Sequence, residues 1–514
     1  MKSVMSHQFS QVPRADIQRS KFDRSHGVKT TFDSGYLIPV FVDEALPGDT
    51  FNLRTTGFAR LATPIYPVMD NINLDTFYFS VPVRLVWDNF KRMMGEQRNP
   101  KDSTDFICPV VKSPVGGFEE LSLFDYFGIP TKVPNLSINA TFSRAYNLIW
   151  NEWFRDQNLQ DSVVVDLDDT DDDPADYVLL KRGKRHDYFT SALPWPQKGP
   201  SVDLGLSGNA PVGFASGVPG DTVNVSQHGS SLFRELGTAG PRLILDADVS
   251  ENSRSLTADM NDVTAVTINQ LRTAFQVQKM LEKDARGGTR YIEMIRSHFG
   301  VTSPDARLQR PEYLGGGSSR VNITPVAQTS GSDGSTVQGN LAAMGTVSFQ
   351  GNGFVKSFTE HCVIIGMVCV RADLTYQQGL NRMFTRSDKL DFYWPALSHL
   401  GEQTIVNREI FAQGSAVDDE VFGYQERYAE YRYKPSTIHG RFRSNSAVPL
   451  DAWHLSQHFA DLPILGPKFI EDSPPIARVI AVPDEPEFIA DFYHHLVCAR
   501  PMPMYGEPGM IDHF

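Results

Sequence analysis

The sequence has few cysteines and no long apolar run. Four cysteines occur in 514 residues, and none of them forms a CxxC pair. So few cysteines exclude a disulfide scaffold and favour reduced, mostly buried thiols in a protein made in a cytosol. The longest apolar run covers only residues 362–370, whereas a membrane helix needs roughly 20 residues. The first residues lack the apolar core of a secretory signal. We therefore expect a protein that is neither secreted nor inserted in a membrane.

Positive charge is also scarce, and catalytic signatures are missing. The 48 Lys and Arg residues against 61 Asp and Glu residues give a net charge of −13, which argues against a generally basic nucleic-acid-binding protein. No GxxxxGK[ST] phosphate loop occurs. His454 and His458 have the spacing of a metal-binding pair, but the glutamate of that motif and a third ligand are missing. We expect no enzyme activity and no cofactor.

The sequence is rich in apolar residues that follow β-like patterns. Hydrophobic residues make up 41% of the chain, which is enough for a large core. Apolar and polar residues alternate over residues 76–86, which predicts a strand, and Pro82 indicates an edge strand or a bulge there. Helical spacing predicts helices over residues 145–154 and 268–284. Because the alternating βαβ rhythm of a parallel sheet is absent, a mainly β fold, an antiparallel double-sheet jelly roll with long connections, fits best.

The length allows three domains, or one domain with large insertions. Residues 1–30 are basic and lack periodicity, which predicts an arm that lies on another surface. Two stretches rich in Gly and Ser, residues 197–262 and 315–353, are predicted to be long loops. Residues 263–300 are predicted to form a helical insertion between them. We therefore interpret residues 31–514 as one domain that carries these insertions.

The densest charge in the chain is an acidic run over residues 166–176. Clustered carboxylates suit a hard cation such as calcium, but the calcium-loop template fails because Asp171 stands where glycine is needed. A solvated or arginine-paired loop is therefore favoured over a metal site. The carboxylates of the metal alternative are Asp168, Asp169, Asp171 and Asp172.

A basic run follows directly after the acidic one. It could neutralise the acidic run within a subunit, pair across an interface, or meet phosphates. Its candidate interface residues are Lys181, Arg182, Lys184 and Arg185.

The basic N-terminal arm has two interpretations. Chain ends are commonly disordered tails. Alternatively, the arm lies inward and contacts nucleic acid or a neighbouring subunit, since its cations can neutralise phosphates and its Phe9 and Phe22 can stack on bases. The candidate cations are Arg14, Arg19, Lys21 and Arg24.

Several long segments, in the right order, resemble one known family. The strongest of them are residues 38–50, 188–199, 284–291, 310–316 and 505–509. Over nearly the whole length, from Arg14 onward, the chain resembles the major capsid protein of the Microviridae, the small single-stranded-DNA phages, and specifically the gokushovirus branch.

The resemblance implies an eight-stranded jelly roll of the viral capsid type and a homo-oligomeric icosahedral shell of about 60 copies. The shell would enclose a circular single-stranded DNA genome. The implied partners are an internal scaffolding protein, a DNA pilot protein and a host surface receptor. Residues 203–262 would form a protrusion at the threefold axes that serves host attachment. The implied location is the virion, with synthesis and assembly in the cytoplasm of the bacterial host.

Inter-subunit contacts in such a shell would be anchored by aromatic residues and arginines. A candidate stretch contains Tyr424, Tyr428 and Tyr431, although a core hairpin explains it equally well. The competing function class is a cytosolic jelly-roll enzyme or a carbohydrate-binding module, because the same fold serves both. That class needs a cleft with paired carboxylates or a histidine cluster, and spacing alone assigns neither.

Overall fold

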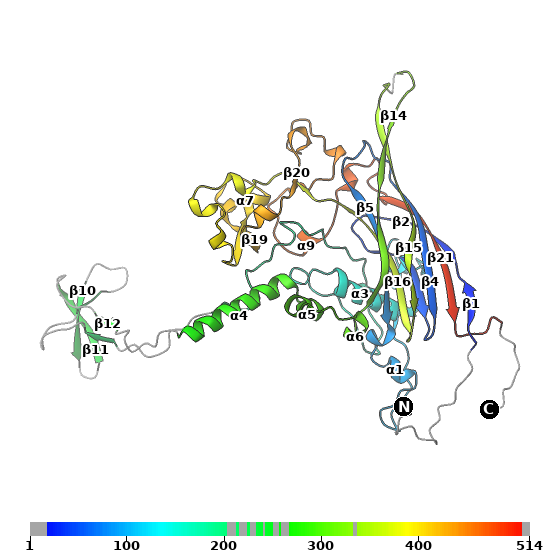
Figure 1. The fold of residues 1–514 in the computed structure, drawn as a ribbon, viewed down its shortest axis with the longest axis horizontal. Helices are drawn as coiled ribbons and strands as arrows, with labels where there is room; N and C mark the ends of the chain where they lie inside the picture. Colours follow the sequence, from blue (N-terminus) through cyan, green and yellow to red (C-terminus); the bar gives the residue numbers. More distant parts are fainter. Residues whose placement is uncertain are drawn as a thin grey trace. The chain divides into compact units, whose positions relative to one another are not determined.

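The computed structural model describes residues 18–202, 212–214, 224–226, 233–239, 242–249, 256–258, 267–332 and 337–505. The chain divides into two compact units. The first unit combines Met1–Pro196 with Gly287–Phe514, and the second is Gln197–Arg286 (Figure 1). No helix among the described residues is long and apolar enough to cross a membrane.

The first unit contains two large antiparallel sheets. One has the order β1–β21–β4–β15–β14, and β2 also pairs with β21. Its strands are β1 (Ser20–Asp23), β2 (His26–Phe32), β4 (Thr50–Leu61), β14 (Asn322–Ala327), β15 (Leu341–Ser357) and β21 (Phe488–Arg500). The other has the order β13–β5–β16–β3. Its strands are β3 (Ile38–Ala45), β5 (Ile72–Pro82), β13 (Glu312–Arg320) and β16 (Cys362–Ala372).

The main core lies between these two sheets. Every second residue of β4 and of most of β21 is buried, whereas the residues between them are exposed. This alternation is expected of a strand with one face on a core and one face in water, because successive side chains point to opposite faces. Inward residues of β4 and β21, such as Leu61 and Phe488, share one buried cluster with Ile38 of β3 and Val368 of β16. The sheets therefore pack face to face.

The outer face of the second sheet is covered by its own chain. All residues of β16 are buried, so both of its faces lie against protein. One face contributes Ile365 and Met367 to a second cluster, together with Tyr146 and Ile149 of α3 (Thr141–Ile149). One π-helical turn, Trp150–Phe154, continues α3. The helix predicted over residues 145–154 is confirmed, and it is buried as its all-round bulk requires.

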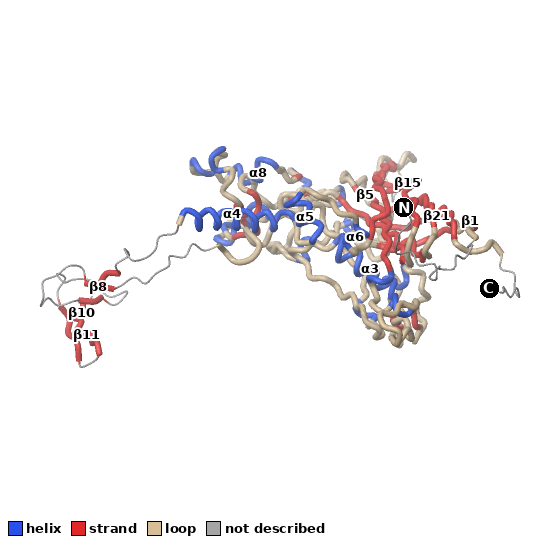
Figure 2. Tube along the Cα trace, turned by 60° about the horizontal axis from the view of Figure 1, so that its bottom comes forward, coloured by secondary structure: helices blue, strands red, loops and turns tan. Residues whose placement is uncertain are grey.

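The connections of the first unit contain shorter helices and strands. Figure 2 shows that much of the chain outside the two large sheets is loop. Three further strand pairs are β6 (Val110–Lys112) with β7 (Ser137–Asn139), β17 (Thr375–Tyr376) with β20 (Ser436–Thr437), and β18 (Glu402–Val406) with β19 (Val421–Glu426). The short helices are α1 (Phe90–Met93), α2 (Leu123–Tyr126), α5 (Tyr291–Phe299), α6 (Asp305–Leu308), α7 (Asn407–Ile410), α8 (Ala429–Arg432) and α9 (Pro467–Ile470).

The second unit contains small strand pairs and one long helix. Its strands are β8 (Val212–Phe214), β9 (Asn224–Ser226), β10 (Phe233–Ala239), β11 (Arg242–Val249) and β12 (Leu256–Ala258), paired in the orders β11–β10–β9 and β12–β8. The helix α4 (Ile268–Gly287) begins after Thr267, whose side chain forms the expected capping contacts with Gln270. The predicted helix over residues 268–284 is confirmed. The remaining residues of the 197–262 insertion from 203 onward lie outside the described ranges.

The prediction of a loop over residues 315–353 is wrong. Most of this segment forms β13, β14 and β15. Its glycines serve close packing instead of turns: a Cβ on Gly315 would lie 2.5 Å from the Gly353 carbonyl oxygen, and one on Gly316 would lie 2.1 Å from the Thr76 carbonyl oxygen. Glycine is needed in a strand where another backbone approaches this closely.

Two further boundaries differ from expectation. Residues 20–30, predicted to belong to an arm, lie in β1 and β2 and pair with β21. Residues 1–17 of that arm lie outside the described ranges. The strand predicted over residues 76–86 is β5, but it is an interior strand between β13 and β16, not an edge. Pro82 is tolerated there because it is the last residue of β5, where the missing N–H breaks no interior ladder.

Candidate functional sites

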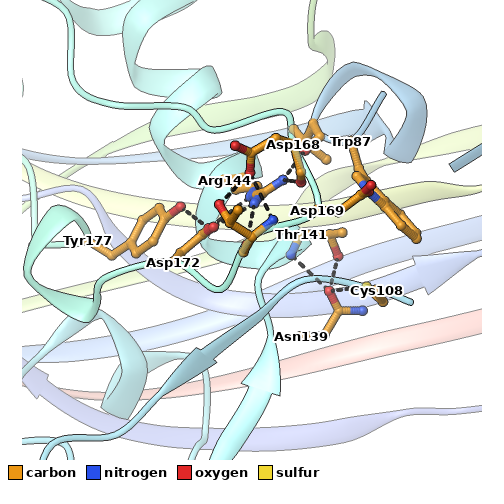
Figure 3. A network of polar contacts seen from close by, with 11 residues as sticks. Trp87, Cys108, Asn139, Thr141, Arg144, Asp168, Asp169, Asp172 and Tyr177 are labelled. Atoms are coloured by element: carbon orange, nitrogen blue, oxygen red, sulfur yellow. Dashed lines mark hydrogen bonds and ion pairs between the residues drawn. The ribbon is translucent and has the colours of Figure 1, made fainter. Parts of the chain in front are cut away.

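The acidic run is held by a buried ion pair. Arg144 projects from α3, and its Nε and Nη2 atoms donate to the Asp172 carboxylate at 2.8 and 2.5 Å (Figure 3). Both side chains are 0% exposed. The Tyr177 hydroxyl also donates to Asp172. Burial, and then the hydrogen bond to the carboxylate, raise the pKa of Tyr177. The Arg144 guanidinium also donates to the Val86 carbonyl oxygen at 3.1 Å, which links the acidic run to the chain just after β5.

The other carboxylates of the metal alternative have separate protein donors. Asp168 accepts from the Thr170 hydroxyl at 2.6 Å, and Asp171 pairs with Lys112. Asp169 accepts from the indole nitrogen of Trp87 at 2.6 Å. Within the described ranges, no three His, Cys, Asp or Glu side chains are grouped as metal ligands would be. The arrangement thus follows the arginine-paired interpretation, and the sequence could not reveal which arginine.

The basic run finds its partners elsewhere in the same subunit. Arg182 pairs with Asp75 at 2.6 Å, and Arg185 pairs with Asp373 at 2.9 Å. Lys184 is buried, and this burial lowers its pKa to about 8. The ammonium of Lys181 lies 5.0 Å from the centre of the Tyr36 ring. All of these contacts lie within one subunit, and none of them is with the acidic run.

The N-terminal cations are partly engaged within the chain. Arg19 donates to the Gly48 carbonyl oxygen, and Arg24 forms an ion pair of 2.5 Å with Asp43. Lys21 lies on β1 and is exposed. Arg14 lies outside the described residues. Of the cations expected to face DNA, the structure thus leaves Lys21 at the surface and commits Arg24 to a carboxylate.

Two of the three tyrosines of the candidate interface, Tyr428 and Tyr431, lie side by side. Tyr424 is on β19, and Tyr428 is buried with its ring 6.1 Å from that of Tyr431. The Arg386 guanidinium lies 4.3 Å from the centre of the Tyr431 ring. Tyr431 is half exposed. The core explanation therefore fits Tyr428, and Tyr431 alone of this pair presents a surface to other molecules.

The sequence analysis missed a further surface, which we name the outer β4–β21 face. It consists of the outward residues Arg54, Phe58 and Arg60 of β4 and Tyr493 and His495 of β21. In the antiparallel register, Arg54 is opposite His495, and Tyr493 is opposite Thr56. Thr56 and Phe58 are consecutive outward residues of β4. The signal was present in residues 50–61, where small or apolar residues alternate with Arg54, Phe58 and Arg60.

Comparison with known proteins explains why these features do not form a catalytic centre. A family model described as capsid protein (F protein) matches residues 10–510. The chain belongs to this family of capsid proteins. Capsid protein VP1 of Bdellovibrio phage phiMH2K is 49% identical, and VP1 of Chlamydia phage 1 is 44% identical, each over 99% of this chain and 98% of the relative. VP1 of Spiroplasma virus 4 is 36% identical over 99% of this chain and all of the relative.

The capsid protein is therefore a structural component of the virion, and the family is that of the Microviridae F-type capsid proteins. The alternative of a jelly-roll enzyme or a carbohydrate-binding module is set aside. A capsid protein builds its shell from copies of itself, so part of the subunit surface contacts other subunits. The buried Arg144–Asp172 pair and the paired basic run stabilise the subunit.

Proposed function

We propose that this capsid protein closes into an icosahedral shell of about 60 copies around a circular single-stranded DNA genome. The single observation that carries this proposal is the end-to-end match to capsid proteins of three small phages, which leaves almost no residue of this chain without a counterpart. An internal scaffolding protein and a DNA pilot protein are part of the proposal as assembly partners, and the bacterial cytoplasm as the place of assembly.

We propose the jelly-roll connectivity for the two sheets. The orders β2–β21–β4–β15 and β3–β16–β5–β13 support it. Along the chain, β2, β3, β4 and β5 alternate between the sheets, β13 follows in the same sheet as β5, and β15, β16 and β21 alternate again. Eight strands in two antiparallel sheets with this alternation correspond to two Greek keys wound together.

The segment of residues 203–262, within the second unit, is the proposed surface protrusion for host attachment. It lies in the connection between β5 and β13, and the second unit separates from the rest of the chain as a compact unit of its own. An element that makes its contacts internally can be carried on a shell subunit without contributing to the sheets. Particles in which a short Gly/Ser linker replaces residues 203–262 should assemble but fail to adsorb to host cells. Normal adsorption would refute the attachment role.

Electron microscopy of native particles purified from infected cells tests the central proposal. We expect closed shells of uniform size, with single-stranded DNA that resists nuclease until the shell is opened. A monomer or a small ring as the native form would contradict it, and so would closed shells whose nucleic acid is double-stranded or absent.

A further inference from the structure

The outer β4–β21 face combines features that are rare on a solvated sheet. Phe58 is 50% exposed and Tyr493 is 52% exposed, although exposed faces of antiparallel sheets are normally polar. The two aromatic residues are diagonal neighbours on paired strands, because Phe58 is opposite Asp491 and Tyr493 is opposite Thr56. Diagonal neighbours of this kind are about 7–8 Å apart. The face thus presents two adjacent rings to the solvent.

The outer β4–β21 face also carries two arginines. Arg54 and Arg60 are exposed and form no ion pair with any described residue, whereas Arg144, Arg182 and Arg185 are all paired with carboxylates. They flank the aromatic pair along β4, because outward residues follow one another every second position. Successive outward residues are about 6.8 Å apart along a strand.

Two carboxylates lie on or beside this face: Asp491 of β21, and Asp23 of β1, which is opposite Val497 and interacts with His495. Asp491 stands opposite Phe58, and its charge is compensated by an ion pair of 3.2 Å with Lys29 of β2. The neighbours on the β15 side are uncharged, since Ser348 is opposite Phe58 and Thr346 is opposite Arg60. The face therefore has a net positive charge, although the whole chain has a charge of −13.

We propose that the outer β4–β21 face is a stacking platform for single-stranded DNA on the inner surface of the shell. Phe58 and Tyr493 would stack on successive bases, and Arg54 and Arg60 would neutralise the adjacent phosphates. Stacking tolerates any base sequence, because every base has a π-face, and a genome that must be packaged whole requires such tolerance. This inference rests on the proposed function.

Charge complementarity favours DNA over a second copy of the chain as the occupant. Two such faces packed together would bring unpaired arginines of one subunit towards those of the other, and like charges in contact are destabilising. Among the described residues, the outward side chains of β4 and of most of β21 are exposed. Figure 1 draws no helix on the outer side of these strands, whereas α3 packs on the other sheet.

Ultraviolet cross-linking of intact native particles tests the contact without any substitution. Aromatic side chains stacked on bases form photoadducts, which mass spectrometry of the digested shell locates. We expect adducts at Phe58 or Tyr493. Adducts confined to other aromatic residues, such as the half-exposed Tyr431, would overturn the inference while leaving the DNA-filled shell intact. Particles without single-stranded DNA would instead refute the proposed function itself.

Full-length subunits and a single-stranded oligothymidylate probe test the arginines. The logarithm of affinity falls with the logarithm of salt by about 0.7 for each phosphate neutralised. Arg54→Gln combined with Arg60→Gln should therefore reduce the slope by about 1.4. Arg320→Gln is the matched control, because Arg320 is an exposed strand arginine of the other sheet. An unchanged slope in the double variant overturns the inference.

A second pair of variants tests how much the Tyr493 ring contributes to DNA affinity. Tyr493→Ser should weaken oligothymidylate binding by between about 5-fold and about 150-fold, and Tyr493→Trp should restore it. If Tyr493→Ser instead lowers the yield of closed shells and leaves DNA affinity unchanged, the face is a contact between subunits and the stacking platform is wrong.

Discussion

His494 should make the stability of the subunit depend on pH. This residue of β21 is 0% exposed and joins the two sheets. One ring nitrogen, Nε2, is 2.9 Å from the Val40 carbonyl oxygen of β3, and the other, Nδ1, is 2.9 Å from the Thr55 hydroxyl of β4. The Tyr78 hydroxyl of β5 donates to the same Thr55 oxygen at 2.5 Å. A neutral imidazole that donates from Nε2 and accepts at Nδ1 satisfies every group in this chain.

The size of the effect follows from the pKa of His494. Burial, and then the nearby His26, lower it from 6.5 to about 4. Because the folded-state pKa lies below the unfolded value, the unfolded chain binds the proton first as the pH falls, and stability is lost between those two values. The full difference corresponds to about 3 kcal/mol, of which about 2 kcal/mol is lost between about pH 7 and about pH 5.

Urea unfolding of full-length subunits, followed by tryptophan fluorescence, measures this loss. His494→Gln should be less stable than the wild type near neutral pH, because its amide replaces the imidazole imperfectly, but it should lose about 2 kcal/mol less on acidification to about pH 5. His495→Gln is the control, since it removes an exposed imidazole on the opposite face of the same strand. If His494→Gln loses as much stability as the wild type, the neutral buried histidine is refuted.

Three further predictions concern packing and domain structure. Arg144→Met should lower the free energy of unfolding by about 3–5 kcal/mol, because it leaves a buried carboxylate unpaired, and adding Asp172→Asn should recover part of that loss in thermal unfolding. Gly316→Ala should cost about 1–3 kcal/mol, since its Cβ would meet backbone at 2.1 Å, whereas Gly331→Ala, with no atom within 4 Å, should change stability little in the same assay. Excising residues 203–262 should leave the unfolding midpoint of the first unit unchanged by calorimetry, because the two units are compact separately.

The elements that could be predicted from the sequence are those whose signals lie within one short segment. The helix over residues 268–284 is confirmed because its cap at Thr267 and its glycine stop are both encoded within one segment. The antiparallel, strand-rich architecture is likewise visible as alternation in single strands. In contrast, residues 20–30 were misread as an arm because their strand partner, β21, lies at the other end of the chain.

For the candidate sites too, the sequence showed the local features but not their distant partners. Composition identified the acidic and basic runs, but each run pairs with residues that no spacing rule connects to it, such as Arg144 and Asp75. The glycines after Leu314 were misread because their function is to admit a neighbouring backbone, which the local sequence does not record. Phe58 was overlooked because an outward aromatic residue in a strand looks like core until the register shows its face.

The two sheets differ in what covers their outer faces, and this difference gives the subunit an orientation. The connection between β5 and β13 folds α3 over β16, so that sheet is buried on both sides by its own chain. The outward residues of β4 and of most of β21 are exposed among the described residues. Of the two sheets, the one with β4 and β21 thus presents its own outward side chains at the surface. Because this face carries Arg54 and Arg60, which form no ion pair with a described residue, in a chain whose net charge is −13, we expect its partner to be a polyanion.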